Sequence, residues 1–195
     1  MHRSTGTVMI GCNKETTMGL HVAALILPDE IAGELNKMRG RYRRQMQYLT
    51  TAHISLYPFS VETDPAAVLE ALKSTAVGTK PFCLRLTDVR FFGEPGNAAY
   101  VAVEDNPALI DLHADVVGCA QKFAAKVGWR TLYEPGIFTP HATIGEGMAA
   151  DVLKTVRQKL AGVRLDRQVE IRSFRLFTRC EDGVWRVTHT FPFGQ

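Results

Sequence analysis

Several features that commonly identify a protein class are scarce in this 195-residue chain. It has only four cysteines (Cys12, Cys83, Cys119 and Cys180) and no C-x-x-C pair, so neither a disulfide framework nor a zinc knuckle is expected. No apolar stretch approaches the roughly 20 residues needed to span a bilayer. The N-terminus also lacks an apolar segment long enough for a signal peptide. We therefore expect a cytoplasmic protein with reduced thiols and no membrane partner.

A strong excess of charge of either sign is also missing. Lys and Arg number 23 against 20 Asp and Glu, which gives a net charge of +3. This mildly basic balance suits an anionic ligand but is well short of that of a protein that coats nucleic acid. Apolar residues at 46% and charged residues at 22% are ordinary for a globular protein.

Residues 1–17 have neither helical nor strand periodicity, so we expect a flexible N-terminal extension there, and Met18 is an alternative start. From residue 21 the periodicity becomes legible. It predicts strands at 21–27, 52–59, 81–92, 98–104, 140–145, 167–179 and 183–193. It predicts helices at 29–44, from Asp64-Pro65 onward, from Asn106-Pro107 onward, and at 149–162.

The order of these elements repeats. Residues 20–93 and 97–193 each run strand, helix, histidine-bearing strand, helix, strand. The segment "LTDVRFF" (86–92) aligns with "IRSFRLF" (171–177), which sets Arg90 against Arg175 at an offset of 85 residues. A duplicated unit is therefore predicted. We expect residues 18–195 to form a single domain of the α+β class. Its two pseudo-symmetric lobes should be mainly antiparallel sheet flanked by helices, with equivalent strands face to face.

Each half contains a strand in which a histidine precedes a hydroxyl residue by two positions. The motifs are "TAHISLYPFS" (51–60) and "TPHATIGEG" (139–147), offset by 88 residues. Residues i and i+2 of a strand share a face. One face therefore carries His53, Ser55 and Tyr57 in the first motif, and His141, Thr143 and Gly145 in the second.

Paired imidazoles and hydroxyls suit displacement at a phosphodiester. The reaction needs a base for the attacking oxygen and an acid for the departing one, and histidine can serve as either near neutral pH. Ser55 and Thr143 would donate hydrogen bonds to the non-bridging phosphoryl oxygens. No metal or cofactor is required by this scheme.

"HISL" and "HATI" resemble the twin motifs of the 2H phosphoesterase superfamily, which includes RNA 2′,3′-cyclic phosphodiesterases and bacterial 2′-5′ RNA ligase-like proteins. The resemblance runs from about residue 20 to the C-terminus. It implies two lobes with a central cleft, metal-independent catalysis by His53 and His141, and phosphate binding by Ser55 and Thr143. Pro140 keeps the family's proline before the histidine, whereas Ala52 departs from it.

Other parts of the expected cleft are less specific. Tyr57 is hypothesised to stack on a base or bond the phosphate, with simple packing as its alternative, and Gly145 to leave room for a nucleoside. The segment "RGRYRR" (39–44) is interpreted as a solvated helix end, with RNA contact as the alternative. The loop at 128–139 is a candidate lid. His21, His113 and His189 are interpreted as structural.

The predicted function is a metal-independent phosphodiesterase acting on 2′,3′-cyclic phosphate or 2′-5′-linked RNA or nucleotide substrates. The alternatives are a non-catalytic nucleotide- or RNA-binding module with the same cleft, and a zinc hydrolase. The latter would need about three converging ligands. A monomer is expected, with RNA or a cyclic nucleotide as its partner, and the direction of the reaction, hydrolysis or ligation, stays open.

Overall fold

The computed structural model describes residues 19–42, 51–62, 65–93, 97–125 and 132–194. Four predicted features lie wholly or partly outside these residues: the N-terminal extension at 1–17, the alternative start Met18, the end of the arginine-rich segment at 43–44, and residues 128–131 of the candidate lid. None of the described helices is long and apolar enough to cross a membrane.

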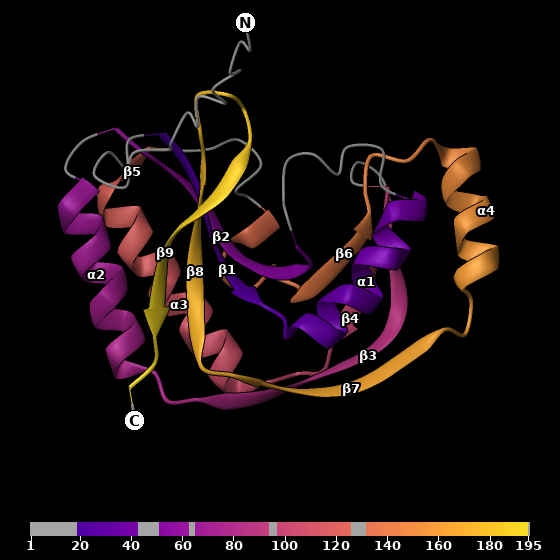
Figure 1. Ribbon diagram of the computed structural model, residues 1–195, viewed down its shortest axis with the longest axis horizontal. Coiled ribbons are helices and arrows are strands. Elements are labelled where there is room, and N and C mark those ends of the chain that lie inside the picture. The colour runs from indigo at the N-terminus through magenta and orange to yellow at the C-terminus, as the bar shows by residue number, and fades with distance from the viewer. Residues whose placement is uncertain (1–18, 43–50, 63–64, 94–96, 126–131, 195) are drawn as a thin grey trace, which may run out of the picture.

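The described strands form one antiparallel sheet that curls along its length (Figure 1). Its order is β7-β3-β4-β6-β2-β1-β8-β9, with β5 paired to β2. The strands are β1 (Gly19–Ile26), β2 (His53–Val61), β3 (Phe82–Phe92), β4 (Ala98–Val103), β5 (Ala124–Ala125), β6 (His141–Gly145), β7 (Arg164–Ile171), β8 (Ser173–Arg179) and β9 (Trp185–Pro192). The helices are α1 (Asp29–Tyr42), α2 (Pro65–Gly78), α3 (Pro107–Phe123) and α4 (Ala150–Leu160). The predicted α+β class with mainly antiparallel sheet is confirmed.

From its centre outward, the sheet is pseudo-symmetric. One side runs β2-β1-β8-β9 and the other runs β6-β4-β3-β7. We call the first, with α2 and α3 packed against it, the His53 lobe. The second, with α1 and α4, is the His141 lobe. Figure 1 separates them as the two sides of the molecule.

Each lobe takes elements from both ends of the chain. Strand β3 belongs to the first sequence half but pairs with β4 in the His141 lobe, whereas β8 from the second half pairs with β1 in the His53 lobe. The predicted single strand at 167–179 is accordingly two strands, β7 and β8, separated by Arg172 and pairing in opposite lobes. Strand periodicity does not reveal this division, because it reports which face a residue occupies and not which neighbour its strand pairs with.

The lobes join where the two histidine-bearing strands pair. Ile54 of β2 lies opposite Ala142 of β6 in antiparallel register, and both side chains have no exposed area. Equivalent strands thus meet edge to edge within one sheet. The expectation that they would lie face to face is wrong. A twofold axis that passes through the sheet lets two equivalent edges exchange backbone hydrogen bonds, which a face-to-face arrangement cannot do.

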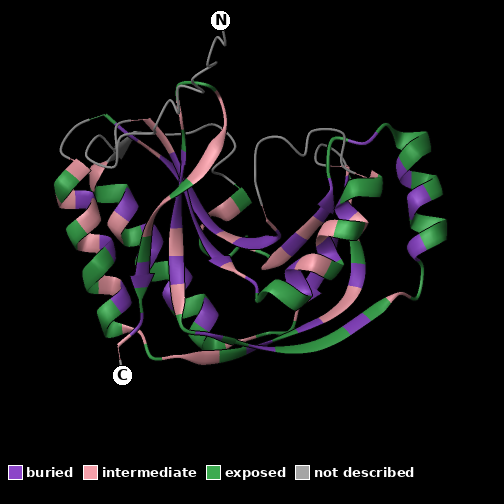
Figure 2. Ribbon diagram, viewed as in Figure 1, coloured by how far each residue is buried: buried purple, intermediate pink, exposed green. Residues whose placement is uncertain are grey.

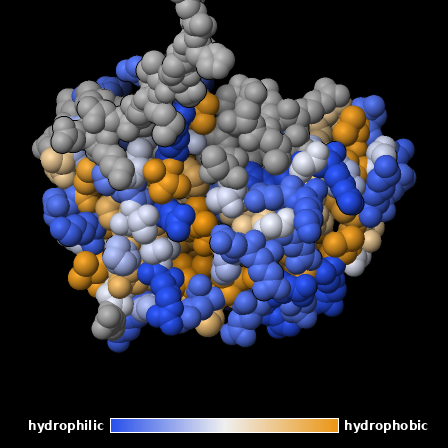
Figure 3. Space-filling model, in the orientation of Figure 1, coloured by the Kyte–Doolittle hydropathy of each residue, from blue (hydrophilic) through white to orange (hydrophobic). Residues whose placement is uncertain are grey.

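The main core is continuous through both lobes, and Figure 2 shows buried positions along the inner sides of the helices and through the sheet. Local signals in the sequence explain the element ends. Asn106 caps α3 by accepting a hydrogen bond from the Leu109 amide at 3.1 Å. Gly183, at φ +76°, turns the β8–β9 hairpin. The outer side of α1 is mostly hydrophilic in the space-filling view (Figure 3).

Candidate functional site

The two histidine motifs lie side by side at the centre of the sheet. Because β2 and β6 run antiparallel, the central pair sets Ser55 next to His141, and His53 next to Thr143. The sequence motifs are 88 residues apart, yet their polar residues share one face of two adjacent strands. The sheet thus brings together the four residues that the sequence singled out.

The predicted alternation of faces holds over the first four residues of each motif and fails at the third predicted members, Tyr57 and Gly145, which are buried. The pairing register shifts at both places, between Ser55 and Tyr57 and between Thr143 and Gly145. Ile54, Leu56, Ala142 and Ile144 have no exposed area and belong to the core. Ser55, His141 and Thr143 are partly exposed, and His53 retains 8% of its surface. Each strand therefore anchors itself with apolar residues on one face and presents polar side chains on the other.

Both histidines are oriented by the same backbone interaction. Nδ1 of His53 lies 2.9 Å from the Thr51 carbonyl oxygen, and Nδ1 of His141 lies 2.7 Å from the Thr139 carbonyl oxygen. A carbonyl can only accept, so Nδ1 carries the hydrogen in each ring. Nε2 is then the nitrogen that can take or give a proton, and the carbonyl two residues earlier fixes this tautomer in both lobes.

Each histidine also contacts a phenylalanine at the same position of the repeat. The ring centroids of His53 and Phe177 are 5.4 Å apart, and those of His141 and Phe92 are 5.0 Å apart. Phe92 and Phe177 are 85 residues apart, the offset found in the sequence. His141 has a second aromatic neighbour, Tyr100, at 5.2 Å.

Burial shifts the acidity of His141. It lowers the pKa of this histidine below its ordinary value, while the hydrogen bond to Thr139 and the nearby Glu146 carboxylate act in the opposite direction. The neutral imidazole is thereby favoured at neutral pH.

A cavity of about 360 Å³ opens beside the second motif. Its volume falls in the range of small-molecule sites. Apolar and aromatic side chains make much of its wall, and His141, Thr143 and Glu146 supply polar groups. The apolar members are Phe92, Ala98, Leu132, Tyr133 and Ile137. His53 and Ser55 are not among its lining residues, so the cavity belongs mainly to the His141 lobe.

Tyr133 connects this cavity to the first motif, and no local pattern in the sequence assigned it a role. The residue lines the cavity and its hydroxyl forms a hydrogen bond with Ser55. Its carbonyl accepts a 2.8 Å hydrogen bond from Nε2 of His113, whose ring stacks on Phe138 at 3.8 Å. Burial raises the pKa of the Tyr133 phenol. The only sequence signal was the length of the loop that carries it.

Two expectations about the flanks of the motifs change. Tyr57 has no exposed area and donates a 3.3 Å hydrogen bond to Glu134, which favours the packing alternative over stacking on a base. A Cβ at Gly145 would lie 2.8 Å from the Tyr42 carbonyl oxygen and would also meet Met148. The expectation that Gly145 leaves room for a nucleoside is therefore wrong, because the end of α1 fills that space.

The arginine-rich end of α1 is interpreted from the sequence as a solvated helix end, with RNA contact as the alternative, and neither interpretation holds for Arg39. Arg39 is only 1% exposed, and its Nη1 donates a 3.1 Å hydrogen bond to Asn36. It is therefore neither a solvated helix end nor placed to contact RNA, whereas Arg41 is exposed. Helix periodicity did not reveal this burial, because Arg39 lies where α1 packs on the His141 lobe.

The remaining described histidines are packed. His21 is buried, shares a 3.0 Å hydrogen bond with Thr178 and stacks on Phe59. His113 is buried beneath the Tyr133 loop, and His189 stacks on Phe191. The structural interpretation is confirmed for His21 and His113.

Solved structures share this architecture. The TT0787 protein of Thermus thermophilus superposes with a TM-score of 0.62 at 17% identity, over 90% of this chain and 99% of that one. LigT of E. coli in its apo form superposes with a TM-score of 0.62 at 16% identity, over 92% of this chain and 100% of LigT. LigT has also been solved with 3′-AMP and with ATP. At these identities the likeness establishes the fold.

Sequence comparison adds the family. A Bacillus cereus (strain G9842) protein named "Putative phosphoesterase" is 30% identical over 183 residues, which cover 90% of this chain and 98% of that protein. A protein of the same name from Bacillus thuringiensis (strain Al Hakam) is 29% identical over the same shares. The profile of the 2′-5′ RNA ligase superfamily matches residues 27–183, and the chain belongs to that superfamily.

Proposed function

We propose that this protein is a metal-independent phosphodiesterase that acts on 2′,3′-cyclic phosphate or 2′-5′-linked RNA or nucleotide substrates. His53 and His141 are its general acid and base. The observation that carries the proposal is the shared orientation of these rings: each donates Nδ1–H to the carbonyl two residues earlier, on adjacent strands of one sheet face. Two imidazoles in the same tautomer supply one proton acceptor and, when charged, one proton donor.

The reaction balances with these groups alone. A neutral imidazole takes the proton of the attacking water or hydroxyl as its oxygen bonds to phosphorus. The second imidazole, charged, gives its proton to the ribose oxygen as the opposite P–O bond breaks. Each transfer contributes roughly 10²- to 10⁴-fold. Ser55 and Thr143 donate hydrogen bonds to the non-bridging oxygens, where charge develops.

The environment of His141 supports its role as the base in hydrolysis. Burial lowers the pKa of this ring, which favours the neutral form that a base requires. His53 is then the acid. In the ligation direction, a 5′-hydroxyl replaces water as the attacking group and the two proton transfers are otherwise the same.

The cavity supports a nucleotide as the substrate. Its apolar and aromatic wall suits a nucleoside, and its polar members include the imidazole of His141 and the hydroxyl of Thr143. E. coli LigT, which shares the fold, binds 3′-AMP and ATP. The role of Tyr57 in this scheme is to support the site through Glu134.

The test is a substrate panel of 2′,3′-cyclic nucleotides, cyclic-ended oligonucleotides and 2′-5′-linked oligomers, with the His53→Ala/His141→Ala double variant as control. We expect turnover by the wild-type protein that survives excess EDTA and follows a bell-shaped pH profile, since one ring must be neutral and the other charged. Binding of these ligands without turnover would instead support the nucleotide-binding module. Loss of activity in EDTA would support a zinc hydrolase, although the described residues contain no group of three or more His, Cys, Asp or Glu arranged to hold a metal.

A further inference from the structure

The pseudo-symmetry places one arginine in each lobe at the equivalent position of the sheet relative to its motif. In the His141 lobe, Thr143 lies opposite Tyr100, which lies opposite Arg90. In the His53 lobe, Ser55 lies opposite Ala24, which lies opposite Arg175. Residues directly opposite in antiparallel strands share a face. Both arginines therefore lie on the histidine-bearing face, two strands out from the central pair.

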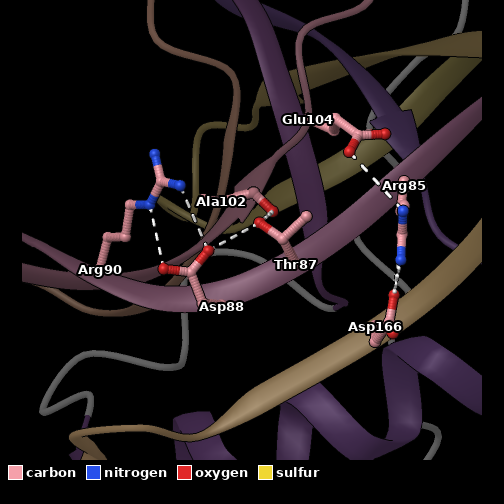
Figure 4. A network of polar contacts seen from close by, with 7 residues as sticks. All are labelled: Arg85, Thr87, Asp88, Arg90, Ala102, Glu104 and Asp166. Carbon is pink, nitrogen blue, oxygen red and sulfur yellow. Dashed lines mark hydrogen bonds and ion pairs between the residues drawn. The ribbon is translucent and has the colours of Figure 1, made fainter.

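In the His141 lobe this row is closed to a ligand. Tyr100 is only 6% exposed and stacks on Phe92 at 4.1 Å, so an aromatic ring occupies the position between Thr143 and Arg90. The Arg90 guanidinium is already paired, because its Nε and Nη2 donate to the Asp88 carboxylate at 3.1 and 3.3 Å (Figure 4). The Tyr100 ring therefore separates Arg90 from Thr143, and the Asp88 carboxylate neutralises the charge of Arg90.

In the His53 lobe, small residues stand at the positions that correspond to Tyr100 and Asp88. Ala24 stands in the place of Tyr100, and Ser173, 85 residues after Asp88, stands in the place of that carboxylate. Nε of Arg175 is buried and has no hydrogen-bond partner in the part of the chain that the structure describes. A charged group whose buried donor lacks a partner is costly to the fold. The charge of Arg175, unlike that of Arg90, is therefore left for an anionic ligand to meet at the guanidinium.

The spacing suits a ligand that Ser55 also holds. Two strand spacings of about 4.8 Å separate Arg175 from Ser55. Only the methyl group of Ala24 stands between them in the row. A long side chain that lies over Ala24 and a phosphoryl group bound at Ser55 can together bridge this gap. Guanidinium is also the side-chain group best matched to phosphate oxygens.

We propose that Arg175 is a third phosphate-binding side chain of the site and contacts the phosphoryl group from the His53 lobe. The inference rests on the proposed function for the identity of the ligand. It makes the site electrostatically one-sided: the His53 lobe supplies the permanent positive charge, whereas the corresponding charge of the His141 lobe is neutralised by Asp88.

The experiment measures binding of inorganic phosphate by calorimetry and kcat/KM on a 2′,3′-cyclic nucleotide. Arg175→Met should weaken both by roughly 10- to 100-fold, the range for losing a hydrogen bond to a charged group. Arg175→Lys should recover part of the loss, because it restores the charge without the fork. The matched control is Arg90→Met, which should stay within about twofold of the wild type. An Arg175→Met protein that binds phosphate like the wild type, or an equal loss in Arg90→Met, would overturn the proposal.

A second variant tests the same idea with Arg175 intact. Ser173→Asp supplies the carboxylate that Asp88 provides in the other lobe, so it should weaken phosphate binding in the same direction while urea unfolding shows an intact fold. Unchanged phosphate binding in a folded Ser173→Asp protein would count against the proposal. The two proposals fail separately. If the wild-type protein turns over no phosphodiester, the proposed function is wrong. Phosphate binding that is weakened in Arg175→Met would still support the role of Arg175.

Discussion

The His53 and His141 lobes are alike in the contacts that orient their histidines and differ in the residues that flank the two motifs. In both, a carbonyl two residues earlier orients the ring and a phenylalanine from the repeat contacts it. In the His141 lobe, aromatic residues and a cavity surround the motif. In the His53 lobe, Ser55 is hydrogen-bonded by Tyr133, and Ala24 stands where the other lobe has Tyr100. Symmetric parts suit a reaction that needs one acid and one base, and asymmetric parts suit a substrate with two different ends.

The largest test of the comparison removes either member of the histidine pair. His53→Ala and His141→Ala should each lower kcat/KM by roughly 10²- to 10⁴-fold. The double variant should fall little further than the less active single variant, because the two rings act as one unit. Steady-state kinetics with circular dichroism as a folding check measures this. A single variant that keeps near wild-type activity would show that the lobes do not share the chemistry.

The next test concerns the packing at position 145, which is Gly in the His141 lobe and corresponds to Tyr57 in the His53 lobe. Gly145→Ala should reduce the free energy of unfolding by about 1–3 kcal/mol, because its Cβ would crowd the Tyr42 carbonyl oxygen. Gly118→Ala is the matched control. Gly118 lies inside α3 with nothing within 4 Å of an added Cβ, so alanine should stabilise by about 0.5–1 kcal/mol. Urea unfolding compares the two, and a neutral Gly145→Ala would contradict the close approach of α1.

A smaller effect is expected on the pH profile of kcat/KM, because burial beside the cavity lowers the pKa of His141. This lower pKa keeps the ring neutral to a pH below the ordinary histidine value of about 6.5, and in the proposed mechanism the neutral ring is the base. The acid limb of kcat/KM should therefore lie below pH 6.5. Phe92→Ala opens the ring to water and should move that limb upward. A limb that stays in place in Phe92→Ala would mean that another group sets it.

The smallest expected effect is at Tyr57. Tyr57→Phe keeps the buried ring and loses the hydrogen bond to Glu134, which also accepts one from Gln121 at 3.1 Å. We expect a loss of about 0.5–1.5 kcal/mol in unfolding free energy and a nearly unchanged kcat/KM. Urea unfolding and the substrate panel measure the two quantities. A drop of more than about tenfold in kcat/KM would restore Tyr57 as a direct contact of the substrate.

Local patterns in the sequence were sufficient for much of this protein. Apolar alternation assigned His53 and Ser55 to one face of a strand. Capping residues and prolines located the helix starts, and the repeat offset of 85 correctly matched the phenylalanines that contact the two catalytic candidates. These features depend on the backbone period and on neighbours a few residues away, so they are legible in a single chain.

Only the tertiary structure decided which strands are neighbours. It paired β2 with β6 edge to edge, exchanged β3 and β8 between the lobes, and brought Tyr133 to Ser55. It also revealed that α1 closes on Gly145. Arg90 is paired with the Asp88 carboxylate, whereas Nε of its counterpart Arg175 has no hydrogen-bond partner among the described residues. The physical reason is that backbone hydrogen bonding between strands is nearly independent of side-chain identity. The choice among partners therefore rests on burial and packing summed over the whole sheet.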